Sequence, residues 1–240
     1  MTHASTLVRD RLSAGLFLAG AAIGLVGNGL HPHVADPDPA SALEAITGNA
    51  AWVGIHLAII LAILLLAGGM VGLAGLLRNG PGRRLAELGL AAALVGSAIV
   101  VTSLSIDGFA MKALAMSWAA GADSGSAEAL ALAGTVKTID LGVWSAGMLV
   151  FFGVTFICFG AAVATQRLLP RWLGWLALTG GAGSVVASML QIAAGGEVQL
   201  AETLFLGSSL LLTVWAFAVG FVTWRGVGGR AALDGDTPDR

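Results

Sequence analysis

The chain has 240 residues, of which 57% are hydrophobic and 11% are charged, and its mean hydropathy is +0.88. Soluble domains carry about 25% charged residues, so this composition excludes a fold that relies on a water-facing polar surface. The formal net charge of −2 and the lack of a basic cluster argue against a nucleic-acid partner. The composition therefore indicates that the solvent of this chain is a lipid bilayer.

Six stretches without Asp, Glu, Lys or Arg are long enough to cross about 30 Å of hydrocarbon, which takes about 20 helical residues. In chain order they are Leu12 to Leu30, Leu57 to Leu77, Leu88 to Ile106, Leu141 to Thr165, Trp172 to Gly196, and Thr203 to Trp224. The runs are continuous rather than alternating, which favours helices over strands. The sequence predicts an all-α, polytopic bundle of six transmembrane helices over 12–225, between a tail at 1–11 and a disordered tail at 226–240.

The basic residues predict the orientation of these helices. With the N-terminus in the cytoplasm, the cytoplasmic segments hold ten arginines: Arg9, Arg11, Arg78, Arg83, Arg84, Arg167, Arg171, Arg225, Arg230 and Arg240. The outer segments hold only Lys112 and Lys137. Ten against two follows the positive-inside rule, so both termini are predicted to be cytoplasmic.

The outer segments contain further helical patterns. Pro39 to Glu44 predicts a short helix with proline at its first position, and Gly48-Asn49 predicts its end. The alanine-rich segment from Gly108 to Val136 predicts helix on both sides of Gly121 to Gly125. Spans three and four are therefore expected to extend beyond the membrane as a helical hairpin. Spans one, three and five each end near a polar residue, which leaves open a threefold repeat of hairpins.

Polar side chains from all six predicted helices fall at one depth, near the outer leaflet. They are Asn28, His31, His56, Asp107, Lys112, Lys137, Asp140, Gln191 and Glu202. Burying an ionisable group without a partner costs several kcal/mol, so such groups at a membrane edge often mark a site. Two interpretations stay open. In a shared outer pocket, Asp107 would pair with Lys112 or Lys137; at solvated helix ends, Lys137 would pair with Asp140 instead.

The histidines, carboxylates and serines of the sequence bear on metal, haem and serine chemistry. His31, His33, His56 and Asp107 are weak candidates for a zinc-like ion, since no H-E-x-x-H or H-x-x-x-H motif fixes two ligands together. Haem is disfavoured because three of the four histidines crowd one edge. No serine has a G-x-S-x-G context. The sequence predicts no cofactor, with a metal ion as the alternative.

A family resemblance is carried by three segments. Leu169-Pro170-Arg171-Trp172-Leu173-Gly174-Trp175 places an interfacial tryptophan after a basic turn, Ile106 to Lys112 forms a D-G-x-A-x-K stretch, and His31-Pro32 accompanies Trp52 to His56. With these features the chain resembles uncharacterised prokaryotic six-helix membrane proteins grouped as domains of unknown function. The resemblance implies a multi-pass protein of a prokaryotic plasma membrane, and it implies no activity.

Three function hypotheses follow. The favoured one is non-enzymatic: binding, or passing, a small molecule, lipid or ion at the outer pocket, with His56 as a proton- or ligand-responsive donor. The alternatives are a metal-assisted membrane enzyme and an accessory subunit that packs through glycine faces against a membrane-protein partner or a second copy. The sequence specifies no substrate.

Overall fold

The computed structural model describes residues 3–32, 39–121, 124–166 and 168–234, and these residues form helices and short connections. In chain order the elements are α1 (His3–Leu30), α2 (Pro39–Gly48), α3 (Trp52–Leu77), α4 (Arg83–Ser105), the π-helix η1 (Ile106–Ala110), α5 (Met111–Ala120), α6 (Ser124–Gly147), the π-helix η2 (Met148–Val154), α7 (Thr155–Thr165), α8 (Arg171–Ala194) and α9 (Gln199–Asp234). The described residues include no strand. The predicted all-α fold is confirmed.

Six continuous helical stretches are long and apolar enough to cross a membrane, as predicted. They are Asp10–Leu30, Trp52–Leu77, Arg83–Ala120, Ser126–Thr165, Arg171–Ala194 and Gln199–Gly226. The third runs through α4, η1 and α5, and the fourth through α6, η2 and α7. This chain is therefore a multi-pass membrane protein.

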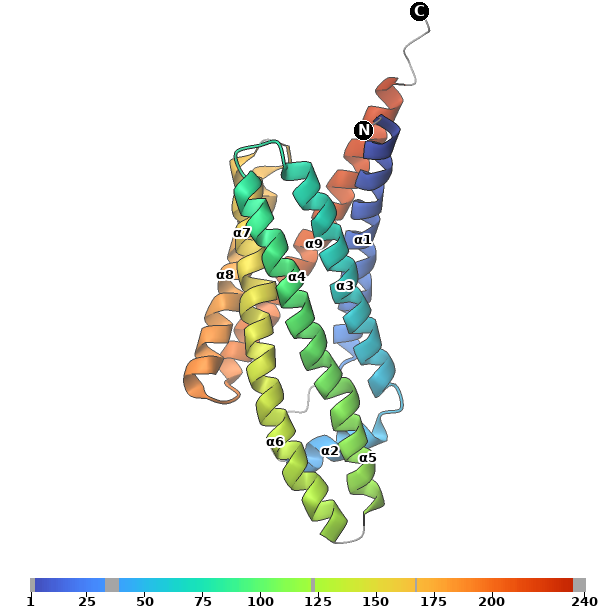
Figure 1. Cartoon of the computed structure of the whole chain (residues 1–240), viewed down its shortest axis with the longest axis vertical. Helices are drawn as coiled ribbons and strands as arrows, with labels where there is room; N and C mark the ends of the chain where they lie inside the picture. Colours follow the sequence, from blue (N-terminus) through green and yellow to red (C-terminus); the bar gives the residue numbers. More distant parts are fainter. Residues whose placement is uncertain (1–2, 33–38, 122–123, 167, 235–240) are drawn as a thin grey trace, which may run out of the picture.

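The spans form a closed ring in which α1 packs against α3 and α9, α8 against α9 and α7, and α4 against α7 and α3. Both ends of the chain lie at one end of the bundle, and the α5–α6 hairpin projects from the other (Figure 1). The helix α2 packs against α5 and α6 at that second end, which we call the α2 end. The expected helical hairpin and the expected short helix are both present.

Several helices begin or end a few residues away from the predicted apolar runs, as at the start of the second span and the end of the sixth. The second span begins at Trp52 rather than Leu57, because a polar histidine within the first turns of an apolar helix does not prevent helix formation. His56 thereby becomes a helical residue. The last helix continues past Trp224 to Asp234, since a helix does not have to end at the edge of its apolar run.

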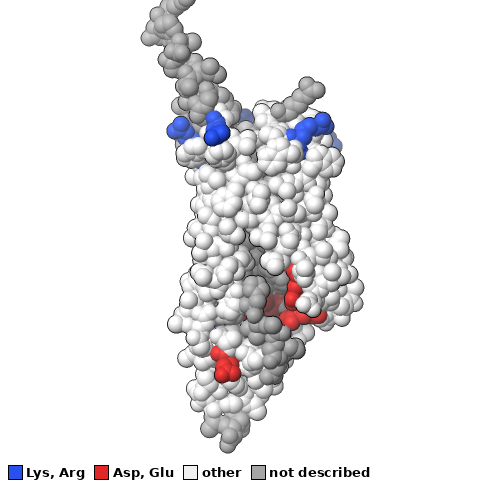
Figure 2. All heavy atoms as spheres, turned by 180° about the vertical axis from the view of Figure 1, so that it is seen from behind, with Lys and Arg blue, Asp and Glu red and all other residues white. Residues whose placement is uncertain are grey.

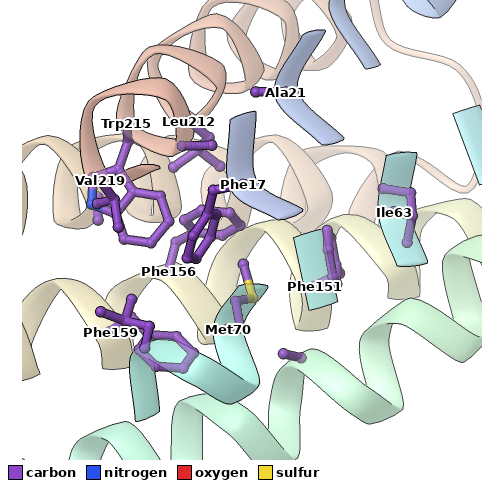
Figure 3. Close-up of a cluster of buried hydrophobic side chains, with 14 of the residues drawn as sticks. Phe17, Ala21, Ile63, Met70, Phe151, Phe156, Phe159, Leu212, Trp215 and Val219 are labelled. Carbon is purple, nitrogen blue, oxygen red and sulfur yellow. The ribbon is translucent and has the colours of Figure 1, made fainter. Parts of the chain in front are cut away.

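Large aromatic side chains fill the centre of the bundle. The ring of Phe17 on α1 meets that of Trp215 on α9 edge-on at 5.7 Å, and Trp215 meets Phe156 on α7 at 5.1 Å. Figure 3 shows these side chains directed toward one another, with Met70 of α3 beside them. All four residues are at most 2% exposed, so the middle of the bundle is a packed apolar core.

A second, smaller core lies at the α2 end. Leu43 and Ile46 of α2 pack there with Trp52, Met111 and Ala115. Trp52 is the first residue of α3, so one side chain from the start of a membrane-spanning helix belongs to this cluster. We call this group the satellite core.

Arginine side chains gather at one end of the bundle. Figure 2 shows Lys and Arg at the end that carries both termini, whereas the Asp and Glu side chains visible on this face lie in the other half. The turn between α3 and α4 and the start of α8 lie at the arginine-bearing end, as the sequence predicts for its basic turns.

Candidate functional site

Three side chains from separate helices converge near the α2 end. His31 directly follows α1, His56 lies in the second turn of α3, and Asp107 is the second residue of η1. The Nε2 atom of His56 lies 2.9 Å from Oδ2 of Asp107 and 3.2 Å from Nε2 of His31. Nε2 of His31 lies 3.4 Å from the same Oδ2. We call these three residues the triad.

The ring of His56 is fixed by its own helix. Its Nδ1 lies 2.8 Å from the carbonyl oxygen of Trp52, one turn earlier. Because a carbonyl oxygen only accepts hydrogen bonds, Nδ1 carries the proton and donates it. The other nitrogen, Nε2, is thus the one that faces Asp107 and His31. The side chain of His56 is fully buried, so this orientation is enforced by packing as well as by the hydrogen bond.

Trp52 and Gly108 allow α3 and η1 to contact each other closely at this point. The indole Nε1 of Trp52 donates to the carbonyl oxygen of Asp107 at 3.1 Å, and its ring lies 4.7 Å from that of His56. A Cβ atom added to Gly108 would stand 2.6 Å from Cβ of His56. The π-helical turn and the glycine therefore let η1 approach α3 closely enough for Asp107 to reach His56. Such π-helical turns are frequent at functional sites.

A second carboxylate lies beside the triad. The hydroxyl of Ser103 on α4 donates to Oδ1 of Asp140 on α6 at 2.7 Å. Asp140 is close enough to interact electrostatically with both Asp107 and His56. Two acidic groups therefore lie close together here, Asp107 within the triad and Asp140 beside it.

The two lysines predicted to pair with Asp107 have other partners. Nζ of Lys112 donates to the carbonyl oxygens of Ile46 at 2.7 Å and Asn49 at 3.2 Å, where it caps the C-terminal end of α2. Lys137 forms an ion pair with Glu197 at 3.2 Å rather than with Asp140. The partners that the structure gives to Asp107 are the two histidines.

The side chains of the remaining described candidates have other partners or surroundings. The exposed Asn28 donates to the carbonyl of Gly24 on its own helix, and Glu202 is exposed in the first turn of α9. Gln191 is buried and accepts a hydrogen bond from Ser145 at 3.3 Å. His33, a candidate metal ligand, lies outside the described residues.

Sequence reasoning did not select Trp52, Ser103 or Gly108 as site residues. A signal for Trp52 existed, because a carbonyl four residues before a helical histidine lies within reach of its Nδ1. Ser103 and Gly108 could not be found in this way, since their roles depend on which helices become neighbours.

The triad residues do not line the groove between α1 and α3. This apolar groove of about 520 Å³ is lined only by Ala, Val, Ile, Leu and Gly residues such as Leu30 and Ile55. The triad atoms instead lie within 3.4 Å of one another. The three side chains are therefore in direct polar contact with one another.

The fold and the triad define a six-helix membrane protein with a compact His–Asp cluster at one end of its bundle. Over residues 12–220 the chain matches the family described as a domain of unknown function, DUF4386, and it belongs to that family. This confirms the family resemblance stated from the sequence. No curated protein and no solved structure matches the chain.

Proposed function

We propose that this chain is a plasma-membrane protein that binds a small cation at the outer end of its helix bundle, through His31, His56 and Asp107. The observation that supports the proposal best is the convergence of two imidazole nitrogens and a carboxylate oxygen from three helices, with no distance above 3.4 Å. Side chains that converge from separate helices in this way are typical of ligand sites within bundles.

The local charge favours a cation over an anionic or lipid ligand. Asp107 within the triad and Asp140 beside it both contribute negative charge. Lys112 and Lys137, the two basic residues predicted near the site, are engaged by carbonyls of α2 and by Glu197. A positive ligand would thus offset a charge that no lysine neutralises there in the described part of the chain.

Binding is favoured over passage. A conduit would have to continue from the triad through the middle of the bundle, where Phe156 and Trp215 are at most 2% exposed. The described spans are also continuous helices, whereas many transporters have broken helices near the midplane.

The segregation of arginines supports an orientation with both termini in the cytoplasm and the triad near the outer leaflet. In a Cys158→Ala background, we expect Glu44→Cys to react with a membrane-impermeant maleimide in intact cells. Asn79→Cys, in the turn after α3, should react only after permeabilisation. Both positions are exposed, so accessibility to the reagent reports the side of the membrane. The reverse labelling pattern would contradict the orientation.

A cation screen tests the proposed function. The purified protein in detergent is heated with Na⁺, Mg²⁺, Ca²⁺, Mn²⁺, Co²⁺ or Zn²⁺, and its Tm is measured. At a concentration of 100 times Kd, a cation that binds only the folded protein stabilises it by about 2.7 kcal/mol, so we expect at least one clear rise in Tm. Asp107→Asn should abolish the rise. Glu202→Gln, an exposed carboxylate away from the triad, should retain it. If no cation raises the Tm of the natural protein, the proposal is wrong.

A metal-assisted membrane enzyme is the second candidate. The observation that favours it is Asp140, a carboxylate oriented by Ser103 and adjacent to the triad without belonging to it. A carboxylate that is not itself a ligand can act as a general base beside a bound metal ion.

A further inference from the structure

We infer that the cation is a divalent transition-metal ion of the Zn²⁺ class, held by Nε2 of His31, Nε2 of His56 and Oδ2 of Asp107. This inference rests on the proposed function, in which the same three atoms bind a cation. The three atoms fall within the mutual distances at which protein side chains can share one metal ion.

The spacing of the three atoms fits the coordination sphere of such an ion. Zinc binds nitrogen and oxygen ligands at about 2.0–2.1 Å, which places tetrahedral ligands about 3.3–3.4 Å apart and octahedral ligands about 2.9–3.0 Å apart. The observed separations are 2.9, 3.2 and 3.4 Å. The three atoms therefore form a triangle of the size that one face of a zinc polyhedron requires.

The lone pairs of the triad are compatible with a bound metal ion. With its proton on Nδ1, a neutral His56 presents a lone pair from Nε2 to the carboxylate of Asp107, which is itself only an acceptor. A single proton on Nε2 of His31 can satisfy only one of its two contacts. A metal ion above the triangle would accept all three lone pairs at once.

The surroundings of His56 are those of a metal ligand. A ligating histidine usually donates its second ring N–H to a carboxylate or a backbone carbonyl, which fixes the tautomer and the ring orientation. Nδ1 of His56 makes that hydrogen bond to Trp52. The carbonyl of Asp107 in turn accepts from the indole of the same tryptophan. One residue thus orients two of the three ligands.

The types of ligand atom select the class of metal. Mg²⁺ and Ca²⁺ prefer sites made of oxygen atoms, whereas imidazole suits zinc, iron, nickel and copper. Two imidazoles and one carboxylate match the ligand set of sites in which three protein groups leave one position for water or another molecule. In such a site the fourth position would hold water or another molecule.

Cobalt and zinc titrations of the full chain test this inference. After removal of bound metals in detergent, we expect Co²⁺ to bind with one equivalent and to develop visible absorption bands from imidazole coordination, and Zn²⁺ to displace it. Asp107→Asn and His31→Ala should each weaken Co²⁺ binding by at least about 100-fold, since even the loss of a group that merely orients a ligand costs 10–100-fold. His31 lies beyond the end of α1, so His31→Ala spares the packed core. His3→Ala, which changes a histidine outside the triad, should leave the titration unchanged.

The outcomes separate this inference from the proposed function. If Co²⁺ and Zn²⁺ do not bind, while Na⁺, Mg²⁺ or Ca²⁺ raises the Tm of the natural protein and not that of Asp107→Asn, a cation site exists and the transition-metal inference is wrong. If no cation has an effect, both are wrong. Metal binding that survives both His31→Ala and Asp107→Asn would place the metal elsewhere and overturn the assignment of ligands.

Discussion

Gly108→Ala should weaken the binding of Co²⁺ or Zn²⁺ by about 100-fold, although glycine is not a ligand. An added Cβ would stand 2.6 Å from Cβ of His56 and 2.7 Å from its Cγ. Real Cβ atoms essentially never come this close, so either η1 or the His56 ring must move. Either shift changes the distance between Nε2 of His56 and Oδ2 of Asp107, which is 2.9 Å in the structure. The change is measured by isothermal titration of the metal-free protein.

Gly134→Ala provides the matched control for this variant. Gly134 also lies in a helix, but a Cβ there would have no neighbour within 4 Å. We expect its metal affinity to equal that of the natural protein. Equal affinities for Gly108→Ala and Gly134→Ala would show that the close approach of η1 to α3 is not what brings the ligands together.

Gly96→Ala should destabilise the bundle by about 1–3 kcal/mol, the usual cost of overpacking a core. A Cβ at Gly96 on α4 would lie 2.6 Å from the backbone nitrogen of Phe151 and 2.7 Å from its Cα, within η2. Backbone atoms cannot rotate out of the way, so two helices must separate. Thermal unfolding in detergent should show a lower Tm.

The control for Gly96 is Gly142→Ala, for which the expected change has the opposite sign. Gly142 lies in α6, and a Cβ there would meet nothing within 4 Å. Alanine is favoured over glycine within a helix by about 0.5–1 kcal/mol, so the Tm should stay unchanged or rise slightly. A fall in Tm for both variants would indicate a general sensitivity to helix substitution rather than a contact at Gly96.

The fold was predictable because it depends on features that are local in the sequence. Long apolar runs, basic turns and the proline at the start of α2 each act through their immediate neighbours, and they gave the six spans, α2 and the α5–α6 hairpin. The helix start at Trp52 was not predicted because the polar His56 interrupts the apolar run that follows Trp52. The orientation in the membrane remains a prediction.

The site was only partly predictable. Its three principal residues were among the nine candidates, since polarity at the edge of an apolar run is visible in the sequence. Their selection depends on which helices are neighbours and on the extra residue in the turn of η1, neither of which a hydropathy pattern contains. The expected pairing of Asp107 with a lysine was wrong for the same reason. The sequence does not show that α2 packs beside Lys112, whose partners are carbonyl oxygens of α2.

The double role of Trp52 has a consequence for local stability. Its ring belongs to the satellite core with Leu43 and Ile46, and its indole and carbonyl groups orient two residues of the triad. Opening of the α2 end, where α2 packs against the α5–α6 hairpin, would therefore disturb the triad even if the membrane-spanning helices stayed intact. By thermodynamic linkage, we expect an ion bound at the triad to slow amide hydrogen exchange in α2, a helix that contributes no residue to the triad.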